Sequence, residues 1–168
     1  MTSTELRAVQ APIKQHYRDD PAAALVTLRA DGELGSGVSC SVQTGHALVQ
    51  AGLHPGTGGD GLSACSGDML LQALVACAGV TLSAVATSLE LAVTGSVHAE
   101  GDLDFRGTLG VDRDAPVGFR EIRLRFDLST DASAEQLATL IRLTERYCVV
   151  YQTLANPPAL KVWPDPAG

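Results

Sequence analysis

The chain has 168 residues and a formal net charge of −7 at pH 7. This length is enough for one domain with a sizeable core, and we expect a single domain over residues 1–168. The acidic balance argues against nucleic acids and anionic membrane surfaces as partners, because both recruit basic side chains. No apolar signal-peptide core follows Met1, so we expect a cytoplasmic protein whose four cysteines are not a permanent disulfide framework.

The first part of the chain is predicted to form strands after an N-terminal arm. Residues 1–20 fit either a loose arm or a short helix, which Pro12 would interrupt. Strands are expected over residues 22–30, 33–43 and 47–51, with turns at Asp31-Gly32 and Thr44-Gly45. Cys40 falls on the apolar side of the second strand, and packing is its expected role.

A glycine-rich loop over residues 54–67 leads into a long apolar helix over residues 69–89. Asp68 falls in the first turn, where a negative charge suits the helix dipole. The helix is uncharged and long enough to cross a membrane. However, its flanks are acidic and several polar side chains interrupt it, namely Gln72, Thr81, Ser83, Thr87 and Ser88. We therefore expect a helix that is buried on most sides within a soluble protein.

The rest of the chain is predicted to return to strands and to end with a second helix. Alternating apolar residues predict two half-buried antiparallel strands, with Val97, Ala99, Leu103 and Phe105 in one and Ile122, Leu124, Phe126 and Leu128 in the other. The second helix begins near Ser133, which has capping-box spacing with Gln136. Its apolar stripe is Leu137, Leu140, Ile141, Thr144 and Cys148. With a last edge strand over residues 160–163, the order of elements predicts an α+β domain.

Cys77 and Cys148 are the residues most able to carry chemistry. Cys77 lies in the middle of the apolar helix, and Cys148 ends the stripe of the second helix. Both helices should pack toward the same core, so the two sulfur atoms could meet. A disulfide would require their Cα atoms to lie within about 4.4–6.8 Å, which helical spacing cannot establish. On pattern alone, two small buried hydrophobic side chains are the favoured interpretation.

The segments that contain these cysteines resemble a known family. One runs from Gly58-Gly59-Asp60-Gly61 through Ser66-Gly67-Asp68 to Ala76-Cys77, and the other is Glu145-Arg146-Tyr147-Cys148. Together they resemble the OsmC/Ohr family of osmotically inducible and organic hydroperoxide resistance proteins, and its OsmC-like branch in particular. The order of elements fits as well, so the resemblance extends over about residues 25–162.

The resemblance implies an OsmC-like fold in an intertwined homodimer, with active sites at the subunit interface. It implies that Cys77 attacks an organic hydroperoxide and becomes a sulfenic acid, and that Cys148 resolves this acid to a disulfide. A dithiol, such as a dihydrolipoyl group, would then reduce the enzyme. The resemblance implies no metal and no bound organic cofactor.

Three positions differ from the peroxidase members of that family. A proline usually follows the second cysteine there, whereas Val149 and Val150 follow Cys148 here. Those members also use an arginine from the N-terminal strands, held by a glutamate. Arg29 is our candidate for the arginine, with Arg18 as the second choice, and Asp68 is the candidate for the acid. The alternative for Asp68 is a simple helix N-terminal charge.

The remaining candidates carry less weight. Cys65 is either an additional thiol or a loop residue without a role, and the second is favoured. The four histidines, His16, His46, His54 and His98, form no metal-ligand spacing with a cysteine, and we expect turn or surface roles. Two rival functions stay open beside the peroxidase. One is a non-catalytic binder of a small apolar or acyl ligand, and the other is a thiol redox sensor.

Overall fold

The structure is a computed structural model. It describes residues 2–5, 8, 10, 11, 15, 19, 32–34, 39–44, 47–110 and 112–164, with side chains omitted for residues 32–34, 39–44, 47 and 48. Its elements are β1 (Gly32–Leu34), β2 (Ser39–Thr44), β3 (Ala47–Gly52), η2 (Pro55–Thr57), β4 (Ala64–Cys65), α2 (Ser66–Ser88), β5 (Val93–Leu103), α3 (Phe105–Thr108), β6 (Phe119–Thr130), α4 (Ala134–Tyr147) and α5 (Val149–Ala155). Strands, helix, strands and helices follow one another, so the predicted α+β class is confirmed.

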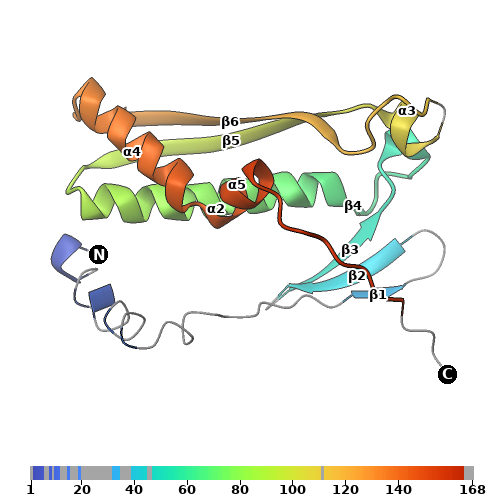
Figure 1. Cartoon of the computed structure of the whole chain (residues 1–168), viewed down its shortest axis with the longest axis horizontal. Coiled ribbons are helices and arrows are strands. Elements are labelled where there is room, and N and C mark those ends of the chain that lie inside the picture. Colours follow the sequence, from blue (N-terminus) through green and yellow to red (C-terminus); the bar gives the residue numbers. More distant parts are fainter. Residues whose placement is uncertain are drawn as a thin grey trace.

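The strands form two separate sheets. The first has the order β1-β2-β3-β4, antiparallel from β1 to β3 and parallel between β3 and β4. The second is the long antiparallel pair of β5 and β6. In Figure 1 this pair lies along α2, and α4 and α5 cross in front of the helix. The core therefore lies between α2, the inner face of β5 and β6, and the two C-terminal helices.

Helix α2 is buried along one face. Its buried residues recur every four positions and are Leu74, Ala78, Leu82 and Ala86. This stripe packs against β5, α4 and α5, as expected for a core helix. The opposite face is exposed in the single chain, where Ala73, Ala76, Val80 and Ser83 lie. The expectation that the helix is buried on most sides is therefore not met within one chain.

By length and hydropathy α2 could cross a membrane, as the sequence also suggested. The same composition suits a core helix, and α2 supplies two of the three buried residues in each core cluster. One cluster joins Leu74 and Ala78 to Cys148, and the other joins Leu82 and Ala86 to Leu140. These contacts are those of a helix around which a domain packs.

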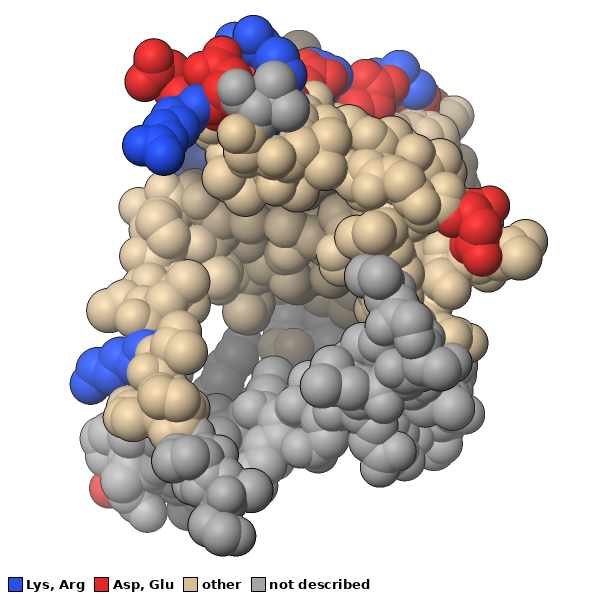
Figure 2. Space-filling view, turned by 90° about the vertical axis from the view of Figure 1, so that its right-hand side faces the viewer, with Lys and Arg blue, Asp and Glu red and all other residues tan. Residues whose placement is uncertain are grey.

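Strands β5 and β6 show the predicted alternation. Apolar residues such as Val97, Ile122 and Phe126 face the core, and charged residues occupy the other face. Figure 2 shows these charges gathered over the sheet. Arg123 pairs across the strands with Glu100 and Asp102 and along β6 with Glu121, and Arg125 pairs along β6 with Asp127. Such exposed pairs contribute little stability individually. Their role is to keep this side of the sheet in water.

Helix α4 begins as predicted and ends earlier than predicted. The Ser133 side chain accepts a hydrogen bond from the Gln136 N–H, and the Gln136 side chain accepts one from the Ser133 N–H, which completes the capping box. The helix then ends at Tyr147, so Cys148 is not its last helical residue. Cys148 is instead the single residue that links α4 to α5. The helix α5 was not predicted.

Several other predictions about elements were wrong. Phe105 opens the short helix α3 rather than continuing β5, because Asp104 accepts a hydrogen bond from the Arg106 N–H and caps the turn. The glycine-rich loop contains η2 and the two-residue strand β4. Residues 160–163 form no strand and are largely exposed, and none of the described strands pairs with them. The helix α2 begins at Ser66, before the predicted start.

The predicted strand over residues 33–43 is two strands. Leu34 pairs with Cys40, so the chain reverses between β1 and β2. The intervening sequence contains Gly35 and Gly37, which favour turns. The predicted strand at residues 22–30 lies outside the described residues. So do most of residues 1–20 and the turn residues Asp31 and Gly45.

Candidate active site

Cys77 and Cys148 occupy one buried cluster. Cys77 lies in the middle of α2 and packs against the buried residues Leu74 and Ala78. Cys148 is 1% exposed and belongs to the same cluster. Three residues of α5 pack on this cluster, namely Val150, Tyr151 and Leu154. The structure therefore brings together two cysteines that are distant in sequence, and both are free thiols.

The backbone at Cys148 explains how this contact forms. Cys148 has φ −72° and ψ 109°, an extended conformation that ends α4 and caps α5. The first N–H groups of any helix lack partners within that helix. In α5 the first intrahelical bond of this kind runs from the Gln152 N–H to the Cys148 carbonyl. The N–H groups of Val149, Val150 and Tyr151 are therefore free to bind the two sulfur atoms.

The Cys77 sulfur atom is surrounded by hydrogen-bond donors. Burial raises the pKa of Cys77, but four interactions oppose burial. They come, in decreasing order, from the Val150 N–H, the Cys148 thiol, the Val149 N–H and the Thr81 hydroxyl. Their combined effect holds the pKa of Cys77 below the usual value for a thiol. Cys77 is thus the cysteine that the site favours as a thiolate, the form that acts as a nucleophile.

Cys148 is affected in the opposite direction. Burial raises the pKa of Cys148, and its interaction with Cys77 raises that pKa further. The N–H groups of Tyr151 and Val150 offset part of this effect. Because the two pKa values move apart, the first proton leaves the pair from Cys77 while Cys148 keeps its own. The arrangement can therefore supply a nucleophile and a neighbouring thiol in one site.

Two grooves lie near the cysteine pair, although neither cysteine lines them. One of about 730 Å³ lies between the inner face of β6 and the C-terminal helices, and Leu74, Phe126 and Tyr151 are among its walls. The other, of about 610 Å³, lies along α2 and α4, where Thr81 and Leu143 line it. Both sizes are in the range of small-molecule sites, and their linings are mainly apolar.

The structure does not bring Asp68 to Cys77 within one chain. Asp68 is exposed in the first turn of α2, nine residues before Cys77. At 1.5 Å per residue the two lie about 13 Å apart along the axis and on roughly opposite sides of the helix. The other two candidates, Arg29 and Arg18, lie outside the described residues.

Cys65 lies at the other end of α2. It is the N-cap residue of that helix and lines a small pocket of about 210 Å³ together with His54 and Asp68. His54 has a structural contact, because its Nδ1 accepts a hydrogen bond from the Gly56 N–H at 3.0 Å. Its ring also packs on the Phe105 ring. These contacts agree with the predicted turn role of His54.

His98 lies on the outer face of β5. Its Nε2 is 2.8 Å from the Ser96 Oγ and 3.4 Å from an Asp127 carboxylate oxygen. Both contacts use the same ring nitrogen, so the three residues cannot relay a proton as a catalytic triad does. His16 and His46 lie outside the described residues, as does the side chain of Cys40. Among the residues that the structure describes, no group of three or more acidic, histidine or cysteine side chains could hold a metal ion.

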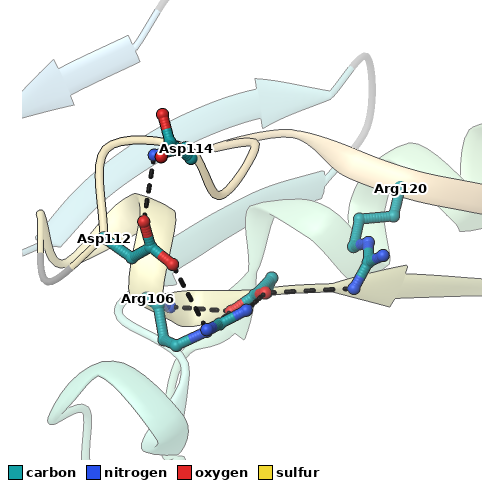
Figure 3. Close-up of polar contacts among 5 residues, drawn as sticks. Arg106, Asp112, Asp114 and Arg120 are labelled. Carbon is teal, nitrogen blue, oxygen red and sulfur yellow. Dashed lines mark hydrogen bonds and ion pairs between the residues drawn. The ribbon is translucent and has the colours of Figure 1, made fainter.

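A polar cluster near α3 is separate from the cysteines. Asp104 is central to it and pairs with Arg106 at 2.6 Å and with Arg120 at 3.9 Å. Arg106 also pairs with Asp112, which accepts a hydrogen bond from the Asp114 N–H, as Figure 3 shows. The cluster fixes the connection between β5 and β6. The hydrogen bond from Arg106 is the main cause that lowers the pKa of Asp104 to about 2.

Sequence reasoning missed three contacts of Cys77. Thr81 could have been found, because it follows Cys77 by four residues and so lies on the same face of α2. The contacts of the Val149 and Val150 N–H groups could not be predicted from the sequence. These groups are free to bind the Cys77 sulfur only because α4 ends before them. The sequence pattern places Cys148 at the end of the apolar stripe of the second helix and does not predict a break before it.

Comparisons with known proteins agree with this arrangement. A model of the OsmC-like protein family matches residues 58–162, a range that includes both cysteines. Among curated proteins, none matches the sequence.

Solved structures share the fold at low sequence identity. An OsmC like protein from Mycoplasma pneumoniae is 17% identical, with a TM-score of 0.65 over 79% of this chain and 89% of that chain. An organic hydroperoxide resistance protein from Elizabethkingia anophelis is 16% identical, with a TM-score of 0.58 over 79% and 91%. The organic hydroperoxide resistance protein OhrB of Bacillus subtilis is 16% identical, with a TM-score of 0.55 over 80% and 94%. Since the family match spans more than half of the sequence and the fold is the same, the chain belongs to the OsmC-like protein family.

Proposed function

We propose that this protein is a cytoplasmic, thiol-dependent reductase of organic hydroperoxides. Cys77 is the peroxidatic residue and Cys148 the resolving residue. One observation carries the proposal. The two thiols interact in a buried cluster in which the pKa of Cys77 is lowered and the pKa of Cys148 is raised. A pair of thiols whose pKa values are pushed apart can divide the roles of nucleophile and proton-bearing partner.

The reaction follows from these roles. The Cys77 thiolate attacks the terminal oxygen of the hydroperoxide, the O–O bond breaks, and the alkoxide takes up a proton to leave as an alcohol. Cys77 is thereby oxidised to a sulfenic acid. The Cys148 sulfur then attacks the Cys77 sulfur, the S–O bond breaks, and water leaves as the disulfide forms. An external dithiol, such as a dihydrolipoyl group, returns both cysteines to thiols and is itself oxidised to a disulfide.

The surroundings of the pair support an organic substrate. The two grooves near the cysteine cluster are mainly apolar and can accommodate an alkyl or aryl group. Burial of Cys148 keeps the resolving thiol close and away from other oxidants. Two structurally similar proteins are organic hydroperoxide resistance proteins, which makes this substrate class the natural first test.

The proposal includes a homodimer with its active sites at the interface. The uncharged face of α2 with Ala73, Ala76 and Val80 is exposed in the single chain and would be covered by a second copy. Asp68 and Arg29 stay in the proposal as helpers of the thiolate. Because Asp68 is distant from the Cys77 of its own chain, it could help only across such an interface.

The test is consumption of cumene hydroperoxide by the fully reduced protein, followed by counting free thiols. We expect the wild type to lose two thiols per chain rapidly. Cys77→Ser should abolish the rapid loss, because the nucleophile is gone. Cys148→Ser should still react but stop at a sulfenic acid, which dimedone traps and mass spectrometry locates on Cys77.

Cys65→Ser is the matched control, since it removes a thiol at the far end of α2. It should leave the rate for Cys77 unchanged. The proposal fails if the wild type reacts no faster than free cysteine, or if Cys77→Ser still loses two thiols at the wild-type rate.

A second candidate function is the binding of a small apolar or acyl ligand without catalysis. The groove of about 730 Å³ beside Tyr151 is the observation that favours it. A ligand binder should keep its affinity for a fatty acid when both Cys77 and Cys148 are replaced by serine. It should also leave cumene hydroperoxide unconsumed.

A further inference from the structure

The two grooves differ in how they meet the cysteine cluster. The groove of about 730 Å³, here called the β6 groove, shares a set of lining residues with the core around Cys77 and Cys148. The shared residues are Leu74, Ile122, Leu124, Phe126, Tyr151 and Leu154. Leu74 is itself a member of the buried cluster, and the other five pack against it. The β6 groove therefore borders the cysteine cluster through one layer of side chains.

The groove of about 610 Å³, here called the α2–α4 groove, adjoins a different part of the core. None of the described residues that line it packs against the cluster with the cysteines, and Val85 packs against the other buried cluster instead. Among these lining residues, Thr81 is the one that interacts with Cys77. Of the two grooves, the β6 groove is therefore the one that borders the cysteine cluster along an extended wall.

The lining of the β6 groove suits an organic group. Ile122, Leu124 and Phe126 alternate on the inner face of β6 and form an apolar wall about 13 Å long, since a strand rises about 3.3 Å per residue. Two of the three charged residues of the groove, Arg120 and Glu121, lie at the start of the strand, where each forms an ion pair. The part of the groove beside the cysteine cluster is thus apolar, and an alkyl or aryl group is stabilised there by leaving water.

Tyr151 lies where the groove and the cluster meet. Its side chain lines the β6 groove and packs against the buried cluster that includes Cys148. Two hydrogen bonds of the next residue hold the helix that carries it. The Gln152 Nε2 donates to the Glu145 carbonyl at 2.8 Å, and the Gln152 Oε1 accepts from the Asn156 Nδ2 at 3.1 Å. The first of these bonds ties α5 to α4, so the ring of Tyr151 has a defined position between the groove and the thiols.

We infer that the β6 groove is the subsite for the organic group of the hydroperoxide, with Tyr151 as its specificity-determining residue. This inference rests on the proposed function, because it places the organic part of the same substrate. An aryl group in the groove packs on the Tyr151 ring, and contacts between aromatic rings stabilise beyond the area that they bury. Hydrogen peroxide has no organic group and cannot use this contact. The ring therefore favours cumene hydroperoxide over hydrogen peroxide.

The experiment measures kcat/KM of the full-length protein for cumene hydroperoxide and for hydrogen peroxide, with dithiothreitol as the reductant. Enzymes discriminate between substrates by the ratio of these two values. Tyr151→Leu keeps an apolar side chain against the cluster and removes the ring. The ratio should fall about fivefold, through a higher KM for cumene hydroperoxide. Tyr151→Phe keeps the ring and should restore the wild-type ratio.

Ala155→Trp tests the groove itself. Ala155 is exposed, lines the β6 groove and lies outside the cysteine cluster. The added ring should obstruct the groove and lower the ratio, because cumene hydroperoxide must enter it and hydrogen peroxide need not. Thr153→Trp is the matched control, since it adds the same ring at an exposed position of α5 that does not line the groove. It should leave the ratio at the wild-type value.

The inference is overturned if Tyr151→Leu lowers both kcat/KM values in equal proportion, which would indicate a structural role, or if Ala155→Trp keeps the wild-type ratio. A lower ratio in Tyr147→Ala with an unchanged ratio in Tyr151→Leu would place the organic group in the α2–α4 groove instead. If the wild type consumes neither peroxide, the proposed function fails. Calorimetry with 2-phenyl-2-propanol, the alcohol product, then decides the subsite: binding that Ala155→Trp abolishes supports it, and absent or unchanged binding overturns it.

Discussion

Cys77 and Cys148 have identical side chains and different surroundings. Cys77 receives several donors at a helix junction, and its pKa falls although burial opposes the change. Cys148 is more deeply buried and lies beside a sulfur that ionises first, so its pKa rises. Both sulfur atoms receive two N–H groups of α5, so the difference comes mainly from their mutual interaction, which lowers the pKa of Cys77 and raises that of Cys148. The same reasoning by individual contacts applies to Asp104, whose neighbours are two arginines.

At the residue scale, we predict that Asp104→Asn destabilises the protein at neutral pH only. The folded pKa of Asp104 is about 2, below its usual value, and the hydrogen bond from Arg106 is the main cause. A lowered folded pKa gives stability that is present above about pH 4 and is lost as the pH falls through about 2. Asparagine keeps the capping hydrogen bond and removes the charge.

Urea unfolding at several pH values tests this prediction. The difference between Asp104→Asn and wild type should be modest at pH 7, as for one ion pair, and should shrink toward pH 2. Asp131→Asn, at an exposed position beyond β6, is the control. If the difference in unfolding free energy were equal at both ends of the pH range, the shape of the Asp104 side chain, rather than its charge, would be what stabilises the fold.

At the scale of elements, the junction of α4 and α5 is the feature on which the site depends. If α4 continued through Cys148, the N–H groups of the next residues would bind helix carbonyls and leave the sulfur atoms without donors. Because α4 ends at Tyr147, the N–H groups of Val149 and Val150 can bind the Cys77 sulfur instead. It also places Val150, Tyr151 and Leu154 over the buried cluster. In most peroxidase members of the family a proline would stand where Val149 supplies an N–H.

We predict that Val149→Pro raises the pKa of Cys77 and slows its reaction at neutral pH. Proline has no N–H, so one donor to the Cys77 sulfur is lost. The fold should tolerate the change, because proline is favoured at the first position of a helix. Cys148 already has the extended backbone that a following proline requires.

The measurement is the pH profile of Cys77 alkylation by iodoacetamide, with Val149→Ala as the control that keeps the N–H. The midpoint should move upward for proline and stay in place for alanine. Equal midpoints for both variants would mean that the Val149 N–H does not stabilise the thiolate.

At the scale of the whole molecule, the single chain leaves apolar surface uncovered around α2. Val80 is 73% exposed, and Tyr147 and Val149 are also largely exposed. Monomeric soluble proteins rarely keep large apolar patches in water. The membership in the OsmC-like family and this surface together support the proposed homodimer. The charged outer face of β5 and β6, in contrast, is suited to solvent (Figure 2).

We predict that Val80→Glu converts a dimer into monomers and lowers peroxide consumption with it. The substitution places a charge on the exposed face of α2 without disturbing the core of the chain. Sedimentation velocity measures the mass of the particle. Thr94→Glu, on the outer face of β5, adds the same charge elsewhere and should leave the mass unchanged. A wild-type protein that sediments as a monomer would contradict the homodimer.

Local pattern was sufficient for much of the fold. The alternation in β5 and β6, the capping box of Ser133 and the uncharged run of α2 each predict an element from neighbouring residues, because side-chain spacing along one strand or helix is a local property. The glycine-rich loop and the part of this run up to Cys77 also carried the family resemblance, together with residues 145–148. Phe105 shows the limit, since a cap at Asp104 outweighed the alternation.

The sequence by itself therefore determined the class of the domain, its main helices and strands, and the two cysteines as candidates. Only the tertiary structure decided that α4 ends before Cys148, that Val149 and Val150 donate to Cys77, and that one face of α2 stays uncovered. These features depend on contacts between segments that are distant in sequence. The β-branched residues Val149 and Val150 even favour strand over helix locally. The packing of α5 on α2 outweighs that preference and completes the site.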